Sequence, residues 1–336
     1  MSCYHPRLMV PTGKYYSKTG KPIYEFIKEP EDRTYLESYE NGVIRVPCGK
    51  CIGCRLDYSR EWADRMMLEL QTAGKAVFVT LTYDNEHIPI MFEDDQPVGY
   101  TVYKKDCQDF LKNLRRDYDG QDGLPYAKIR FYLSSEYGPL TKRPHYHCIL
   151  FGLGLDDFPM RVFKGMNEFN QPFYDVPELK AAWPKGFVTV SEVSWATCAY
   201  VARYTLKKVF EDQVNTNGFE MGVDPEFSLM SRRPGIGAEY LNLHDDCLDY
   251  QNISVKTGKG AHKIFIPNYY LRKVKENCLL PNNPKYDKLF EDRKRFASDS
   301  ALLKMSRISI SYIDQLELEE EKKLRSISSL SRHFDG

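Results

Sequence analysis

The sequence predicts an α+β fold in which helices pack against an antiparallel sheet. Two observations support this class. Short runs of β-branched and aromatic residues, typical of buried strands, alternate with stretches whose apolar residues recur every three or four positions, which is typical of amphipathic helices. With 336 residues and 42% hydrophobic content, the chain is long enough to bury a substantial core.

The first predicted elements follow a segment rich in Tyr, Gly, Pro and Cys, which holds only short strand-like runs such as Val43–Val46. Helical spacing predicts a helix from about Ser59 that ends at Gly74. The run KAVFVTLTYD then predicts a buried strand, and Tyr103–Tyr118 predicts an amphipathic helix.

Two further strands are predicted at Ala127–Gly138 and His145–Gly152, joined by a short loop. A helix near Val176–Trp183, a strand at Gly186–Val193 and a helix at Ala196–Phe210 complete this region. The order β-α-β-β-α-β-α fits a split βαβ unit, that is, a ferredoxin-like or RRM-like antiparallel sheet with helices on one side.

The chain divides into three expected regions: a Cys-rich segment at 1–60, the sheet core at 61–210 and an extension at 211–336. The extension holds a hairpin-like stretch, ISVKTGKGAHKIFIP, and a helical end. Its KTGKGAHK sequence lacks the spacing of a phosphate-binding loop, so we reject ATP binding there.

Composition bounds the partners and the compartment. Lysine plus arginine and aspartate plus glutamate both total 47, so a nucleic-acid surface would have to be a local patch. We expect no membrane span and no signal peptide, because no apolar stretch approaches the roughly 20 residues needed to cross a bilayer. Nine cysteines without a secretion signal favour reduced thiols or metal ligands in a cytosol.

The stretch RPHYHCILFG places His145 and His147 on the same face of a strand. Glu136 ends the preceding strand, and antiparallel pairing would bring its carboxylate near both imidazoles. Two neutral imidazoles and one carboxylate form a half-open shell for a divalent cation, with room for water and a phosphate oxygen. The alternative is a structural histidine pair on the sheet.

The helix ATCAYVARYTLKKVF carries Tyr200 and Tyr204 one turn apart on one face, with Lys207 a turn later. Free tyrosine ionises near pH ~10, so a nearby ammonium group or metal would help it act as a nucleophile. The alternative is an amphipathic helix whose tyrosines lie at the edge of the core.

A third cluster, CGKCIGC, sets Cys48, Cys51 and Cys54 at C-x2-C-x2-C spacing. A tetrahedral structural Zn²⁺ needs a fourth ligand, for which Cys3 and His5 are the candidates. Free thiols in a tight loop and an iron–sulfur site are the alternatives.

Three segments, TLTY (Thr80–Tyr83), PHYH (Pro144–His147) and YVARYTLK (Tyr200–Lys207), follow one another along the chain. This ordered set resembles the HUH endonuclease superfamily, in particular its two-tyrosine rolling-circle replication initiators. The segments PCGKCIGCRLDYSREWADR and MSRRPGIG (Met230–Gly237) resemble the replication-associated proteins of gokushoviruses, small single-stranded DNA phages, some of which infect Chlamydia. The resemblance covers most of the chain.

The resemblance implies an endonuclease that nicks origin DNA, keeps a tyrosine joined to the 5′-phosphate, and later rejoins the displaced strand into circles. It implies Mg²⁺ or Mn²⁺ as the cofactor. The implied metal ligands are His145, His147 and the more variable Glu136, and the implied catalytic residues are Tyr200, Tyr204 and Lys207. Arg203 stands where some relatives have lysine, which keeps the charge.

The resemblance also implies single-stranded and supercoiled phage origin DNA, a host helicase and a host DNA polymerase as partners, in the cytoplasm of a bacterial cell. Basic residues expected to follow the DNA backbone are Lys104, Lys105, Lys112, Arg115, Arg116, Lys256, Lys259 and Lys263. Alternative functions are a non-catalytic origin-binding or RNA-binding module on the same fold, another HUH enzyme such as a plasmid initiator, transposase or relaxase, and a metal phosphoesterase that uses water.

Overall fold

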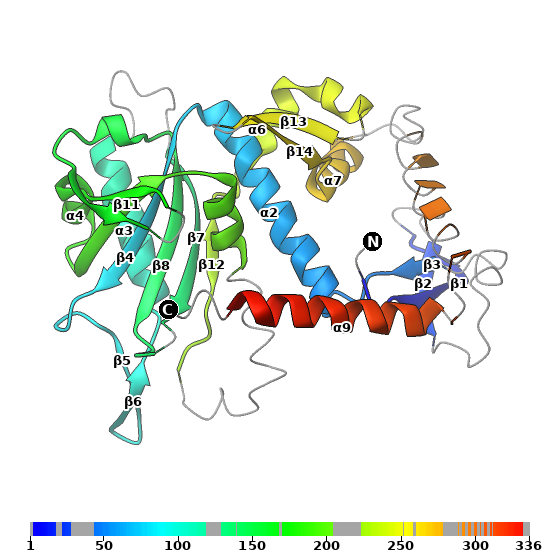
Figure 1. Cartoon of the computed structure of the whole chain (residues 1–336), viewed down its shortest axis with the longest axis horizontal. Coiled ribbons are helices and arrows are strands. Elements are labelled where there is room, and N and C mark those ends of the chain that lie inside the picture. Colours follow the sequence, from blue (N-terminus) through cyan, green and yellow to red (C-terminus); the bar gives the residue numbers. More distant parts are fainter. Residues whose placement is uncertain are drawn as a thin grey trace. The chain divides into compact units, whose positions relative to one another are not determined.

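The computed structural model describes residues 3–17, 22–27, 44–118, 129–138, 140–167, 170–203, 223–250, 252–257, 260–277 and 312–331, with scattered residues between 288 and 310. The chain forms two compact units (Figure 1). The cysteine unit comprises Met1–Tyr58 with Pro284–Gly336, and the sheet unit comprises Ser59–Asn283. These units differ from the three expected regions, because residues 223–277 group with the sheet and residues 312–331 group with the N-terminal segment.

The sheet unit is built on a seven-stranded antiparallel sheet of order β12-β7-β8-β4-β11-β10-β9 (Figure 1). Its strands are β4 (Ala76–Tyr83), β7 (Arg130–Tyr137), β8 (Pro144–Phe151), β9 (Val162–Met166), β10 (Pro172–Asp175), β11 (Gly186–Glu192) and β12 (Ser228–Met230). Because β8 lies between β4 and β7, the connection from β4 through α3 (Lys104–Tyr118) to β7 is a split βαβ unit. The predicted α+β class and its antiparallel sheet are confirmed.

Further elements complete the sheet unit. They are α2 (Ile52–Ala73), which begins in the cysteine unit, the hairpin β5 (Ile90–Glu93) and β6 (Gln96–Tyr100), η1 (Leu155–Asp157), α4 (Pro177–Ala182), α6 (Ala238–Leu243), η3 (Asp245–Asp249), the hairpin β13 (Asn252–Thr257) and β14 (Gly260–Phe265), and α7 (Asn268–Asn277). Residues 195–203 are also helical. Among the residues that the structure describes, no helix combines the length and apolar character needed to cross a membrane.

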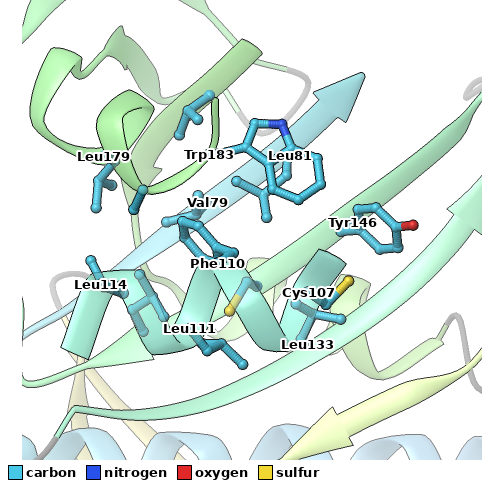
Figure 2. Close-up of a cluster of buried hydrophobic side chains, with 14 of the residues drawn as sticks. Val79, Leu81, Cys107, Phe110, Leu111, Leu114, Leu133, Tyr146, Leu179 and Trp183 are labelled. Carbon is cyan, nitrogen blue, oxygen red and sulfur yellow. The ribbon is translucent and has the colours of Figure 1, made fainter. Parts of the chain in front are cut away.

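One face of the sheet, called here the core face, is apolar. Alternation along β4 and β8 directs Val79, Leu81, Tyr146 and Cys148 to it, and all four are buried. Helices α3 and α4 cover this face, where Phe110, Leu114 and Trp183 are also fully buried (Figure 2). The burial of each such large side chain stabilises the fold by roughly 1.5–3 kcal/mol.

The opposite face, called here the site face, carries Thr80, Glu136, His145 and His147. Two helices pack against it. The Trp62 ring of α2 lies 5.0 Å from the Tyr132 ring of β7, and the Ser134 hydroxyl donates to the Val201 carbonyl at 3.1 Å. The expectation that the helices lie on one side therefore applies to α3 and α4 but is wrong for α2 and the helix at 195–203.

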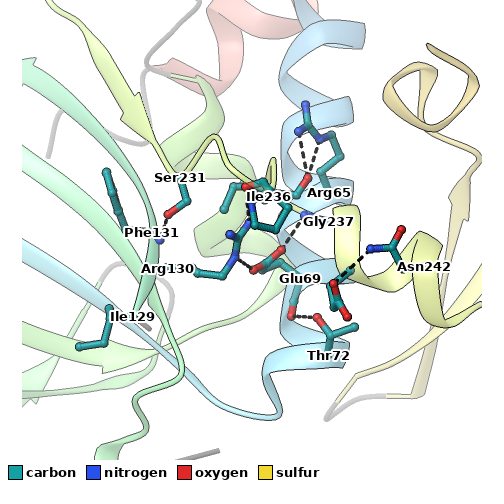
Figure 3. A network of polar contacts seen from close by, with 12 residues as sticks. Arg65, Glu69, Thr72, Ile129, Arg130, Phe131, Ser231, Ile236, Gly237 and Asn242 are labelled. Carbon is teal, nitrogen blue, oxygen red and sulfur yellow. Dashed lines mark hydrogen bonds and ion pairs between the residues drawn. The ribbon is translucent and has the colours of Figure 1, made fainter. Parts of the chain in front are cut away.

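The MSRRPGIG segment is tied to α2 and β7 by a polar network (Figure 3). The Arg65 guanidinium donates two hydrogen bonds to the Ile236 carbonyl, at 3.0 and 2.9 Å. The buried Glu69 carboxylate accepts from the Gly237 amide at 2.6 Å and pairs with Arg130. Gly237 has φ 77°, a left-handed conformation that favours glycine. This segment therefore has a structural role in the sheet unit.

The cysteine unit contains a three-stranded sheet of order β2-β1-β3 and the helix α9 (Tyr312–Ser331). Its strands are β1 (Arg7–Tyr15), β2 (Pro22–Ile27) and β3 (Ile44–Val46). The sequence predicted only short strand-like runs here.

Candidate active site

Pairing of β7 with β8 brings the predicted carboxylate and imidazoles to one face. Glu136 lies directly opposite His145, and His147 lies one step further along the strand. The His147 Nε2 atom is 3.0 Å from Glu136 Oε2, and both side chains are nearly buried. His147 and Glu136 therefore form a direct polar contact on the site face.

Two threonines of β4 orient the imidazoles. Thr80 pairs with His147 and Thr82 with His145 across the β4–β8 ladder. In each pair the threonine Oγ1 lies 3.2 Å from the histidine Nδ1. Holding Nδ1 leaves Nε2 as the atom available to a metal, as in metal-binding histidines with outer-shell partners. The sequence placed both threonines in the TLTY segment without assigning a role to either, although alternation would have put them on one face.

His145 is held in its neutral form by its surroundings. Burial lowers its pKa, the neighbouring His147 lowers it further, and Glu136 acts in the opposite direction. The neutral imidazole is the form that binds a cation. A Cβ atom on Gly138 would lie 3.2 Å from His145 Nε2, so glycine leaves room for this ring.

These residues fit a divalent cation in donor type and in part of their geometry. Neighbouring ligands of an octahedral ion with bonds of ~2.1 Å are roughly 3.0 Å apart, and the His147–Glu136 spacing is 3.0 Å. The ligand atoms of Glu136, His145 and His147 do not, however, form a mutual cluster within 4.8 Å among the described residues. His145 would have to turn from Gly138 toward the pair to complete the set.

Tyr200 lies over the same face. The helix at 195–203 places its ring edge-on to His147, with ring centroids 5.2 Å apart, and 6.2 Å from the Phe78 ring. The structure thus brings a predicted nucleophile next to a predicted metal ligand. The other two predicted catalytic residues, Tyr204 and Lys207, lie outside the described residues.

The start of the Tyr200 helix is anchored from two other elements. The Trp195 indole donates to the Asp64 carboxylate of α2 at 3.2 Å. The His262 ring of β14 packs against Trp195 with centroids 5.0 Å apart. Asp64 is buried, and this burial raises its pKa. The hairpin beyond residue 211, which the sequence left without a role, therefore contacts the helix that carries Tyr200.

A pocket of about 220 Å³ opens beside His147 and Tyr200. Its lining combines aromatic rings with short polar side chains: Phe78, Thr80, His147, Asn167, Phe173, Thr189, Val190, Ser191 and Tyr200. This volume is below the ~300–1,000 Å³ of ordinary small-molecule sites, so the pocket suits one ring of a larger ligand. Asn167 and Phe173 come from the β9–β10 hairpin, which the sequence did not predict.

The basic residues of α3 lie on the helix that covers the core face, away from the histidines. The Arg115 guanidinium donates to the Ile129 carbonyl at 3.0 Å, and Lys105 pairs with Asp109 at 2.6 Å. The site face instead presents Phe187 of β11, which lies opposite Thr82 and is 59% exposed. An exposed aromatic ring beside the histidines was not predicted.

The cysteines predicted as zinc ligands gather in the cysteine unit. The Sγ atoms of Cys3, Cys48, Cys51 and Cys54 all lie within 4.8 Å of one another. Burial raises the pKa of Cys3 to about 11. At Cys48 burial acts the same way, but hydrogen bonds from the Cys51 and Lys50 amides outweigh it and lower the pKa to about 7.

Comparison with known proteins gives relatives along most of the chain. The family model described as replication-associated protein ORF2 matches residues 76–209. The chain is 31% identical over 291 residues to the replication-associated protein ORF2 of Spiroplasma virus 4, covering 84% of this chain and 83% of that protein. It is 28% identical over 241 residues to the replication-associated protein VP4 of Bdellovibrio phage phiMH2K, covering 71% and 70%. The replication-associated protein ORF4 of Chlamydia phage 1 is 28% identical over 219 residues, covering 62% and 49%. No solved structure matches the chain.

Proposed function

This chain belongs to the replication-associated proteins of the microviruses and acts in phage DNA replication, and we propose that it does so by nicking one DNA strand with a tyrosine. The observation that carries the proposal is the contact chain on the site face. The Tyr200 ring lies 5.2 Å from the His147 ring, and His147 lies 3.0 Å from Glu136, beside a pocket. A nucleophile and a phosphate-binding cation would meet at this point.

In the proposed reaction the phenolic oxygen of Tyr200 attacks the scissile phosphorus. The phosphorus–oxygen bond to the 3′ side breaks, which leaves a 5′-phosphotyrosine and a free 3′-hydroxyl. The proton lost by the phenol balances the one gained by the leaving oxygen. Mg²⁺ or Mn²⁺ held by His147, Glu136 and His145 would supply charge neutralisation at the phosphate. The threonine contacts to both Nδ1 atoms keep the imidazoles oriented for this task.

The proposed linkage preserves a phosphodiester, so a 3′-hydroxyl can attack it and restore a continuous strand without ATP. This agrees with a sequence in which we recognise no phosphate-binding loop. The free 3′-hydroxyl would prime a host polymerase, and Tyr204, four residues after Tyr200, would serve the second transfer. Strand separation would depend on a host helicase in the bacterial cytoplasm.

The DNA strand would reach the site as a single strand. One face of the pocket is formed by rings, and its Asn167, Thr189 and Ser191 side chains offer hydrogen-bonding groups. We assign it to a base or sugar next to the scissile phosphate. Phe187, exposed on the same face, would stack on a second base.

The proposal is tested with a labelled single-stranded oligonucleotide that carries the phage origin, incubated with Mg²⁺ or Mn²⁺ and resolved on a denaturing gel. The wild type should give a metal-dependent adduct that survives denaturation. His147→Ala and the double variant Tyr200→Phe with Tyr204→Phe should lose it. Tyr103→Phe, a change at an exposed tyrosine outside the site, should keep it.

Two outcomes would contradict the proposal. Strand cleavage without an adduct would make water the nucleophile and the protein a metal phosphoesterase. Origin binding with neither cleavage nor adduct, with both metals tried, would favour a non-catalytic origin-binding module on the same fold.

A further inference from the structure

The four cysteines of the cysteine unit come from three separate segments. Cys3 precedes β1, Cys48 and Cys51 follow β3, and Cys54 lies in the first turn of α2. All four sulfurs nevertheless face one another within 4.8 Å. Cysteines buried only as small apolar side chains have no reason to converge in this way.

The sulfur spacing distinguishes between the ways in which four cysteines can meet. The Cys48–Cys54 and Cys3–Cys51 sulfurs are each 3.9 Å apart, far beyond a disulfide bond of ~2.05 Å. A tetrahedral Zn²⁺ with Zn–S bonds of ~2.3 Å separates its sulfurs by about 3.8 Å. A four-iron cluster binds each cysteine through a different iron atom and spreads the sulfurs further. The spacing therefore fits one small tetrahedral ion.

Backbone amides surround the sulfurs as donors. The Tyr4 amide donates to Cys51 Sγ at 3.3 Å, and the Cys48 amide donates to Cys3 Sγ at 3.2 Å. The Cys51 and Lys50 amides both donate to Cys48 Sγ, at 3.2 and 3.4 Å. Such outer hydrogen bonds stabilise thiolates and orient metal ligands. Gly49, at φ 74°, permits the turn between Cys48 and Cys51.

The structure also decides between the two candidates for the fourth ligand. His5 Nε2 pairs with Glu320 of α9, whereas Cys3 Sγ belongs to the mutual sulfur cluster. Cys3 and Cys51 are buried, so an ion bound there would be closed to substrate. Four protein ligands with no open position are typical of a structural rather than a catalytic zinc.

We propose that Cys3, Cys48, Cys51 and Cys54 bind one structural Zn²⁺ that joins the start of β1 to the connection between β3 and α2. This inference is independent of the proposed cleavage reaction. The ion stabilises a unit whose three-stranded sheet leaves Tyr15, Phe26 and Ile44 exposed and which therefore has little apolar core of its own.

The test is metal analysis of the full-length protein after gel filtration in a chelator. The wild type should hold about one zinc ion per chain, since a closed four-thiolate site binds tightly. Cys51→Ser and Cys54→Ser should each lose most of it. Cys247→Ser, at a buried cysteine of the sheet unit, and His147→Ala should each retain it.

A second readout does not depend on variants that fold. Replacement of the metal by Co²⁺ should give the visible absorption of a tetrahedral thiolate site, and a thiol-modifying reagent should release one zinc ion. Iron in place of zinc, a metal-free wild type, or cysteines of this cluster linked in disulfides by peptide mapping would each overturn the proposal.

Discussion

The two faces of the central sheet are made by the same strands and differ in almost every property. In β8, Tyr146 and Cys148 point into an apolar layer closed by α3 and α4, while His145 and His147 point to the other side. In β4, Val79 and Leu81 join the core, while Thr80 and Thr82 contact the histidines. Strand alternation thus separates the residues that stabilise the fold from those that we assign to chemistry.

The comparison predicts that substitutions on the core face change the free energy of unfolding, and those on the site face change nicking. The site face is not free of packing, since Phe78 and Tyr132 are buried there. Its polar side chains, however, border a pocket, and its rigidity comes from the layer behind it.

The largest expected effect is on the core face. Phe110→Ala removes a fully buried ring of α3 and should lower the free energy of unfolding by about 3–5 kcal/mol. Denaturant unfolding measures this change. Phe92→Ala, at an exposed ring of β5, should change it by less than ~0.5 kcal/mol. If Phe110→Ala abolished nicking while unfolding like wild type, the division between the faces would be wrong.

The next effect is on the site face. His147→Ala should reduce the nicking rate at least ~100-fold, since the loss of a metal ligand removes several kcal/mol of charge stabilisation. Single-turnover cleavage of the origin oligonucleotide measures this rate, and thermal unfolding checks the fold. His244→Ala, in a loop after α6, should cleave at the wild-type rate. A His147→Ala variant that still cleaved normally would sink the assignment.

A smaller effect separates ligand from orienting group. Thr80→Val keeps the shape of the side chain but removes the hydroxyl 3.2 Å from His147 Nδ1, so metal affinity for the reaction should fall about 10–100-fold. The measurement is the dependence of nicking on Mn²⁺ concentration. Thr80→Ser, which retains the hydroxyl, should restore most of the affinity. Equal behaviour of the two variants would show that the hydroxyl does not orient His147.

The smallest effect concerns the DNA. Phe187→Ala should weaken single-stranded DNA binding by about 1 kcal/mol, the low end for loss of one base stack. Phe163→Ala is a matched control, because both rings are 59% exposed and Phe163 packs against Tyr174 on the core-face side of the sheet. Fluorescence anisotropy with a labelled oligonucleotide measures both. Equal losses in the two variants would contradict the stacking assignment.

The strands and helices with long, regular patterns were predictable from the sequence. The helix predicted at Tyr103–Tyr118 is observed at Lys104–Tyr118, and the β8 strand predicted from His145 begins at Pro144. The β9–β10 hairpin was missed because its strands are short and end on a sheet edge, where alternation is weak. The side of the sheet that α3 covers was also hidden, since an apolar helix stripe does not specify which face it meets.

The candidate site shows the same limit. The spacing of His145 and His147 and the position of Glu136 were visible in the sequence, and the structure brings Glu136 and His147 into contact. The pocket was not visible, because Asn167 and Phe173 reach it from elements without a sequence signal. For the cysteines, spacing indicated three of the ligands, but only the fold distinguishes Cys3 from His5.

The most direct test of the central claim, that a tyrosine on the site face becomes joined to DNA, is mass-spectrometric mapping of the adduct. Trypsin cuts after Lys185, Arg203 and Lys207, so Tyr200 and Tyr204 fall on different peptides. After nuclease trimming, we predict a nucleotide mass on peptide 186–203, on peptide 204–207, or on both in separate molecules. A nucleotide on any other peptide, or no modified peptide from cleaving enzyme, would contradict the account.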